Sequence, residues 1–176
     1  MYESTMKGIP YDPKSTRAIR GKNWENRLFD LLSYLDQDVQ KTWDTYSLRF
    51  PEMDDYAIAA IEQREGDIIV QTSGDKAIHF ECIVCPENGN GYFPEHKRQK
   101  FHPASKKEKW YAFAVSSDGL SGEMYFIPAR VWNSYSGKLP ESFYAGKKFR
   151  VYNAAMIRSI RAKQKLSNFI NVSKKT

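Results

Sequence analysis

Apolar and polar side chains alternate most regularly in residues 66–85, where the pattern predicts two β-strands joined by a tight turn. The first strand covers 67–72 and the second 77–85. Successive side chains of a strand point to opposite faces, so Asp67 opens the first strand and Glu81 lies mid-strand on the polar face of the second. A mid-strand carboxylate is disfavoured unless it has a partner. The hairpin therefore predicts two carboxylates that converge as a divalent cation requires, with two solvated acids as the alternative.

A helical pattern precedes this hairpin at residues 23–35. Its first turn contains Glu25, which lies at the margin of the apolar face of the helix. Glu25 is either a surface acid that interacts favourably with the helix dipole or a side chain that faces the strand carboxylates. Residues 40–49 alternate loosely and predict a strand, whereas 56–62 are ambiguous between a strand and a short helix. The apolar stripe of the helix has the 3.6-residue period and consists of Trp24, Leu28, Leu31, Leu32 and Leu35.

The chain after the hairpin continues with further short elements. The strongly basic stretch 94–109 predicts one helix or two short ones. Apolar and aromatic residues at 110–115 and 124–127 predict a second hairpin. Near the C-terminus, a strand at 149–152 is expected to precede a basic amphipathic helix at 154–165.

Length and composition favour one folded, soluble domain. The chain has 176 residues, of which 14% are aromatic, and no low-complexity bulk. Its apolar runs are far shorter than a bilayer span, and its N-terminus lacks the apolar core of a signal peptide, so we expect an intracellular protein of the cytoplasm or nucleoid with no membrane partner. The two cysteines do not make a disulfide framework.

Positive charge is concentrated at the C-terminal end. Beyond Glu141 the sequence has nine Lys and Arg residues and no acid, although the net charge of the whole chain is only +6. A separate basic end is typical of nucleic-acid binding, with a solubilising tail as the alternative. The residues expected to contact phosphates are Lys147, Lys148, Arg158, Arg161, Lys163 and Lys165.

These patterns divide the chain into three parts. Residues 1–19 form an irregular N-terminal arm, 20–141 form the folded domain, and 142–176 form a basic extension that packs on it.

The order of helix, strand, two-stranded hairpin, helix and second hairpin resembles the restriction-endonuclease-like, or PD-(D/E)XK, nuclease fold. The segment around Glu25 is similar to the first helix of archaeal-type Holliday-junction resolvases and related endonucleases, which carries an acid there. Gly-Asp67-Ile-Ile-Val resembles the strand with the family's metal-binding Asp, and His-Phe-Glu81-Cys-Ile resembles the strand with its (D/E)-x-K element. The resemblance covers residues 20–133 and implies an α/β fold with a mixed central sheet flanked by helices.

The resemblance also implies an activity, which is metal-dependent hydrolysis of DNA phosphodiesters by metal-activated water. Glu25, Asp67 and Glu81 would be catalytic, with Asp67 and Glu81 holding Mg²⁺ or Mn²⁺. DNA would be the partner, RNA is left open as a substrate, and the protein could form a homodimer.

One feature departs from the family pattern, because the lysine expected two residues after Glu81 is Ile83. Lys97 or Lys100, from the basic segment, could supply an amine instead, and we take Lys97 as the catalytic candidate. His79, on the same strand face as Glu81, could also bind metal or position water. If none of them does, the chain is a non-catalytic nucleic-acid-binding or regulatory protein on the same fold.

A different metal site would use the two cysteines. Cys82, Cys85, His96 and His102 have nearly the spacing of a zinc finger, which would make the chain a zinc-stabilised DNA-binding protein. Strand alternation sends the two cysteines to opposite faces unless the strand ends between them. The alternative is a buried Cys82 with unrelated histidines.

Overall fold

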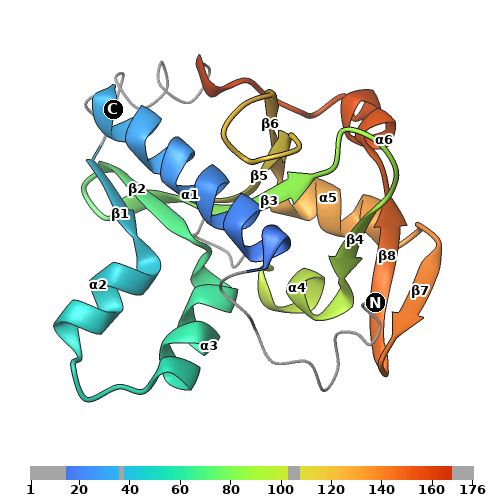
Figure 1. Cartoon of the computed structure of the whole chain (residues 1–176). Helices are drawn as coiled ribbons and strands as arrows, with labels where there is room; N and C mark the ends of the chain where they lie inside the picture. Colours follow the sequence, from blue (N-terminus) through green and yellow to red (C-terminus); the bar gives the residue numbers. More distant parts are fainter. Residues whose placement is uncertain (1–14, 36–37, 103–107, 168–176) are drawn as a thin grey trace.

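The computed structural model describes residues 15–35, 38–102 and 108–167. None of the helices in these ranges combines the length and apolar character needed to span a bilayer. The elements, shown in Figure 1, are α1 (Thr16–Tyr34), β1 (Asp38–Lys41), α2 (Thr42–Arg49), α3 (Asp55–Glu65), β2 (Ile68–Ser73), β3 (Lys76–Cys85), β4 (Gly91–Pro94), α4 (Glu95–Lys100), β5 (Glu108–Val115), β6 (Glu123–Pro128), α5 (Ala129–Ser136), β7 (Glu141–Tyr144), β8 (Lys147–Tyr152) and α6 (Ala154–Ser159).

Two sheets organise these elements. The central sheet has the order β1-β2-β3-β5-β6, and all its neighbours are antiparallel except β3 and β5, which are parallel. A parallel pair needs a crossover connection, and here the crossover contains β4 and α4. The prediction of a mixed central sheet flanked by helices is confirmed. A second sheet, in the order β4-β8-β7, joins the crossover to the C-terminal part of the chain.

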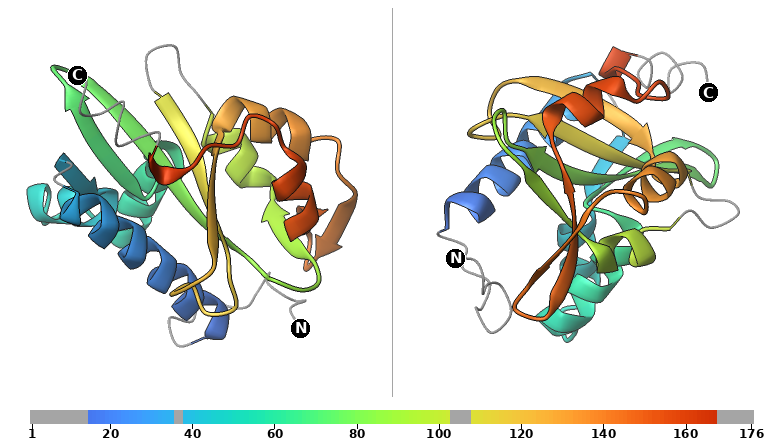
Figure 2. Two further views of the ribbon diagram at one scale, coloured as in Figure 1. Left: turned by 90° about the horizontal axis from the view of Figure 1, so that it is seen from above. Right: turned by 90° about the vertical axis from the view of Figure 1, so that its right-hand side faces the viewer.

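Helix α1 covers one face of the central sheet (Figure 2). Trp24, Leu28 and Leu32 of the predicted apolar stripe are fully buried and pack against β2, β3, β5 and β6. The Trp24 indole also donates a hydrogen bond of 2.8 Å to the carbonyl of Ala112. The helix begins seven residues earlier than predicted, because the Ser15 hydroxyl caps it by accepting a hydrogen bond from Ala18 N–H.

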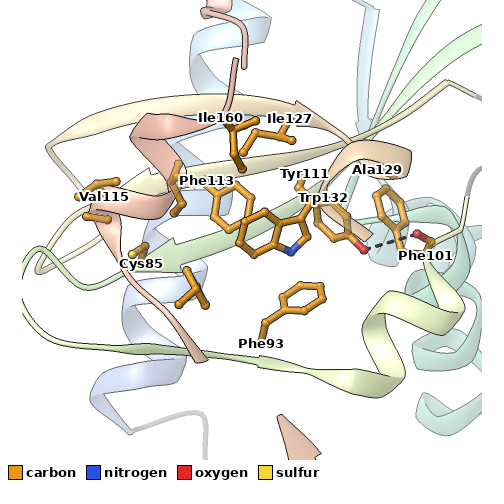
Figure 3. Close-up of a cluster of buried hydrophobic side chains, with 13 residues drawn as sticks. Cys85, Phe93, Phe101, Tyr111, Phe113, Val115, Ile127, Ala129, Trp132 and Ile160 are labelled. Carbon is orange, nitrogen blue, oxygen red and sulfur yellow. Dashed lines mark hydrogen bonds between the residues drawn. The ribbon is translucent and has the colours of Figure 1, made fainter. Parts of the chain in front are cut away.

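The opposite face of the central sheet carries a second, aromatic core (Figure 3). Trp132 of α5 lies edge-on to the rings of Phe93, Phe113 and Tyr152, at centroid distances of 5.7, 4.8 and 5.4 Å. These rings come from β4, β5 and β8. The core therefore ties the second sheet and the C-terminal strand to the central sheet.

Two expectations for the segment between α1 and β2 are revised. The predicted strand at 40–49 is wrong beyond Lys41, because α2 begins at Thr42. Tyr46 and Phe50 stack four residues apart, which is helical spacing. The ambiguous stretch 56–62 is helical and belongs to α3, which the Asp54 carboxylate caps through Ala57 N–H at 2.8 Å.

The C-terminal helix is much shorter than predicted. Helix α6 ends at Ser159, and the chain then turns at residues 161–162 and forms an isolated β-bridge at Gln164 instead of continuing as a helix to residue 165. Gln164 and Phe126 exchange two backbone hydrogen bonds, of 3.0 and 2.7 Å, along the edge of β6. The exposed edge of the central sheet thus offers the backbone partners that a continued helix would otherwise provide.

Candidate active site

Four carboxylates meet at one end of the β2–β3 hairpin. Glu25 comes from α1, Glu62 from α3, Asp67 from the residue before β2, and Glu81 from β3. One oxygen each of Glu25, Glu62 and Asp67 lies within 4.8 Å of the other two. We call these four residues the acidic site. The structure thus brings together all three predicted acids and adds a fourth, Glu62.

Backbone contacts hold Asp67 in place. Its N–H donates to the carbonyl of Phe80 at 2.7 Å, and its carbonyl accepts from Thr42 N–H at 3.0 Å. Its carboxylate accepts from Cys82 N–H at 2.8 Å. The preceding Gly66 has a φ of 91°, and a Cβ there would lie 2.6 Å from the Phe80 carbonyl oxygen, so the corner between α3 and β2 requires glycine.

Sequence reasoning missed Glu62, which lies one helical turn before this corner. The N–H of Gly66 donates to the carbonyl of Glu62 at 2.8 Å and ends α3 there. The only signal in the sequence is that Glu62 stands five residues before Asp67. That signal becomes useful only once residues 55–65 are known to be a helix that turns sharply into β2.

Lys97 supplies an amine at the acidic site. Its Nζ lies 2.5 Å from Oε2 of Glu81, so α4 brings a lysine amine to this strand carboxylate. The Glu81 side chain is 7% exposed and that of Lys97 is 27% exposed. Lys100 lies exposed at the end of α4.

Further amines surround Glu25. Lys22 Nζ lies 3.3 Å and Lys41 Nζ 3.8 Å from Oε2 of Glu25, and Lys41 also donates to the Asn26 side chain. The Glu25 side chain is 12% exposed. Because its carboxylate oxygen also lies within 4.8 Å of those of Glu62 and Asp67, Glu25 faces the other acids. This is one of the two orientations that the sequence left open.

The electrostatics of the site reflect crowding of negative charge. Burial, and then repulsion between the carboxylates, raises the pKa of Asp67 well above its usual range and that of Glu62 to about 7. Burial also raises the pKa of Glu81, although Lys97 opposes this. Burial alone would lower the pKa of Lys97. The attraction between its ammonium group and the carboxylates of Glu81 and Asp67 outweighs burial, so the pKa of Lys97 is raised. The site thus tends to hold protons on its carboxylates unless a cation compensates their charge.

The donor set fits a hard divalent cation. Three carboxylate oxygens from separate elements point at one another, and oxygen ligands of this kind suit Mg²⁺ or Mn²⁺ rather than Zn²⁺. Glu81, which we predicted as a metal ligand with Asp67, pairs with Lys97 through its Oε2, and its contact with a metal remains a prediction.

His79 is turned toward the end of α3. Its Nδ1 lies 2.8 Å from the carbonyl oxygen of Glu65 and 3.5 Å from Oε1 of the same residue. The ring is 6% exposed. Both contacts involve the same ring nitrogen, Nδ1, and both are with Glu65.

The four residues of the zinc hypothesis do not form a ligand group. Within the described ranges, three or more metal-ligand side chains come together only in the acidic site. Cys82 and Cys85 lie in the cores on opposite faces of the central sheet, as strand alternation predicted. Burial raises the pKa of the Cys82 thiol well above its usual range and that of Cys85 to about 11, which disfavours the thiolate that zinc binds.

The basic C-terminal residues are spread over several elements rather than along one helix. Arg158 on α6 lies 2.5 Å from Oε1 of Glu123, and Lys148 on β8 lies 3.3 Å from Glu141. Lys163 Nζ donates to the carbonyl of Ile160 at 3.2 Å. Lys147 belongs to β8, whereas Arg161 and Lys165 follow α6 and are exposed. Their contact with phosphates remains a prediction.

Comparison with known proteins gives a structural likeness at low sequence identity. No family model matches the chain, and no curated protein matches it in sequence. The chain is similar to the solved structure of Archaeoglobus fulgidus Hjc, a Holliday junction resolvase from an archaeal hyperthermophile, with 11% sequence identity and a TM-score of 0.49. The match covers 86% of this chain and 96% of that one. A likeness at this level assigns no activity and no site residue to this chain.

Proposed function

We propose that this protein is a metal-dependent nuclease that hydrolyses DNA phosphodiesters. The observation that carries the proposal is the 2.5 Å contact between Lys97 and Glu81 beside the oxygens of Glu25, Glu62 and Asp67. The PD-(D/E)XK motifs read from the sequence lacked only an amine, and α4 supplies one at the acids. The choice of DNA follows from the resemblance of these motifs to those of archaeal-type resolvases.

Each side chain has a distinct role in this proposal. Glu25, Glu62 and Asp67 hold the divalent cation. When bound, Mg²⁺ or Mn²⁺ would lower the pKa of a water molecule and offset negative charge on the phosphate. The raised pKa of Lys97 keeps the proton on its Nζ near neutral pH, so it acts as a hydrogen-bond donor to water or phosphate. Glu81, whose pKa is also raised, is the proton acceptor next to it.

The exposed basic residues are proposed to contact DNA phosphates. Lys147, Arg161 and Lys165 are the exposed members of the predicted set, together with Arg158, which is paired with Glu123. Phosphate contacts position a protein on DNA without reading its sequence.

The decisive test is a cleavage assay with Mg²⁺ or Mn²⁺ on supercoiled, linear and branched DNA. Asp67→Asn and Lys97→Met should each lower the cleavage rate by about 100-fold or more, because each removes a group that acts in the transition state. Asp75→Asn is the matched control, because it makes the same change at the exposed turn of the same hairpin.

The outcome also separates cleavage from binding. A wild-type protein that binds DNA but cleaves none of these substrates with either ion would overturn the proposal. It would favour the non-catalytic alternative, in which Lys97 neutralises the acids rather than assisting a reaction.

A further inference from the structure

Helix α4 carries Lys97 but does little to fix its own position. The helix has six residues, Glu95–Lys100, and none of them is buried. Its N-cap residue, Pro94, makes no side-chain capping hydrogen bond. A helix of this length is not stable by itself, so contacts outside α4 must place the Lys97 amine at Glu81.

Those outside contacts lie at the two ends of α4. At its C-terminal end, Phe101 is fully buried, and its ring lies edge-on to the Tyr111 ring at a centroid distance of 5.0 Å. Both residues are labelled in Figure 3. At its N-terminal end, Glu95 accepts a hydrogen bond of 2.9 Å from Nε of Arg150 in β8. Glu95 also pairs with Arg98 within the helix. Lys97 lies between these two anchors.

Arg150 is itself held from several sides. It is 8% exposed, and its Nη1 donates to the carbonyl of Leu139 at 3.0 Å. Its Nη2 lies 3.3 Å from Oε2 of Glu141, its cross-strand neighbour in β7. The rigid, permanently charged guanidinium thus joins the β7–β8 hairpin to the start of α4.

Stability alone does not account for this arrangement. Burying a charged pair has a desolvation cost that often cancels the attraction, whereas such pairs can select one geometry among several. Burial would raise the pKa of Glu95, but hydrogen bonds from Arg150 and Arg98 outweigh it and lower that pKa. The pair therefore stays charged and directional near neutral pH.

We propose that Arg150 is a positioning residue for the acidic site: by holding Glu95 it orients α4 and so places the Lys97 amine at Glu81. The catalytic meaning of this placement rests on the proposed function. The placement itself is a property of the protein without DNA. A strand outside the region that resembles the nuclease motifs would thus complete the site.

Placement is tested by the acylation rate of Lys97, measured by mass spectrometry on the DNA-free protein. An amine held 2.5 Å from Oε2 of Glu81, on a side chain that is only 27% exposed, reacts slowly with an acylating reagent, and an amine released from that contact reacts faster. Glu95→Gln and Arg150→Met should each speed up labelling of Lys97 at least about threefold, while Arg150→Lys, which keeps a cation, should restore part of the protection. Arg130→Met, on the exposed part of α5, is the matched control and should change nothing.

A second lysine reports whether the fold is intact. Lys109 is buried and donates to the carbonyls of Arg64 and His102, at 2.6 and 3.0 Å, so its labelling should stay slow in every variant. If Arg150→Met also exposes Lys109, Glu95→Gln decides, because it removes the same ion pair with almost no change of size. Unchanged labelling of Lys97 in Glu95→Gln would overturn the inference.

The cleavage assay separates this inference from the proposed function. Arg150→Met should lower cleavage about 10- to 100-fold through misplacement of Lys97, while Mn²⁺ affinity changes less than about threefold, because Glu25, Glu62 and Asp67 do not lie on α4. A wild-type protein without cleavage activity would overturn the nuclease proposal, yet the labelling result would still decide whether Arg150 positions Lys97.

Discussion

Glu62 makes the chemistry of the acidic site depend on pH near neutrality. It adds a carboxylate oxygen within 4.8 Å of those of Glu25 and Asp67, and its pKa of about 7 arises from burial and then from repulsion by Glu81 and Glu25. A cation that binds there must displace a proton near neutral pH. Metal affinity should therefore rise with pH through the range around pH 7.

The same pKa makes the stability of the metal-free protein depend on pH. Because the pKa of Glu62 rises from 4.5 to about 7 on folding, the folded state binds more protons in this window, and stability falls as pH rises through it. We expect the metal-free wild type to melt about 5 °C lower at pH 7.5 than at pH 5.5. Glu62→Gln should show a smaller decrease, and Mn²⁺ should raise the melting temperature most at pH 7.5.

Thermal unfolding followed by circular dichroism measures this difference. Glu87→Gln, at an exposed position in the loop after β3, is the control and should retain the wild-type pH dependence. An equal pH dependence in Glu62→Gln and the wild type would show that Glu62 does not titrate in this window.

Among the secondary-structure elements, the corner between α3 and β2 matters most for the site. Gly66 ends α3, and the next residue is Asp67. The corner therefore sets Glu62 and Asp67 at a defined separation. Its backbone conformation, with φ of 91° and ψ of 177°, is one that only glycine adopts readily.

Gly66→Ala should test this corner. The added Cβ would lie 2.6 Å from a backbone oxygen, so we expect a loss of about 3 kcal/mol or more in unfolding free energy, together with weaker Mn²⁺ binding. Gly74→Ala is a matched control, since its φ of 54° is also positive but nothing lies within 4 Å of the added Cβ. It should cost about 1 kcal/mol and leave Mn²⁺ binding unchanged. Urea denaturation and calorimetry measure the two effects, and equal losses would show that backbone conformation rather than the close contact dominates.

Across the whole molecule, the second sheet and the aromatic core connect the C-terminal part of the chain to the acidic site. Strand β8 pairs with β4 directly before α4, and Tyr152 packs on Trp132 in the core. The C-terminal part therefore contributes to the fold as well as to the positive charge. Within the described residues 142–167, only some of the basic side chains are exposed to a polyanion.

This distribution of charge predicts which residues control DNA affinity. Replacing exposed Arg161 and Lys165 by Ala should weaken binding to all sequences about equally and flatten the dependence of log affinity on log salt by about two units, if both contact phosphate. Arg158→Ala should matter less, because its guanidinium is paired with Glu123. Binding titrations at several salt concentrations give the slopes, with Arg130→Ala as the control. Curves identical to wild type in the double variant would mean that these residues only aid solubility.

The sequence alone was sufficient for the features that depend on local periodicity. Strand alternation identified the β2–β3 hairpin, with Glu81 on β3 and Asp67 directly before β2, and the helical stripe identified the buried face of α1. These inferences held because the side-chain period of a strand or helix is set by backbone geometry, whatever lies on the other side.

Contacts between distant elements could be known only from the three-dimensional structure. Glu62 joins the acidic site because α3 turns sharply at Gly66. The sequence named Lys97 as a candidate amine, but its contact with Glu81 arises because the crossover between two parallel strands carries α4 over the sheet. The end of α6 likewise depends on the free edge of β6, which no local pattern reveals. A periodic pattern shows which face of an element is buried, but the partner of that face depends on how the whole chain packs.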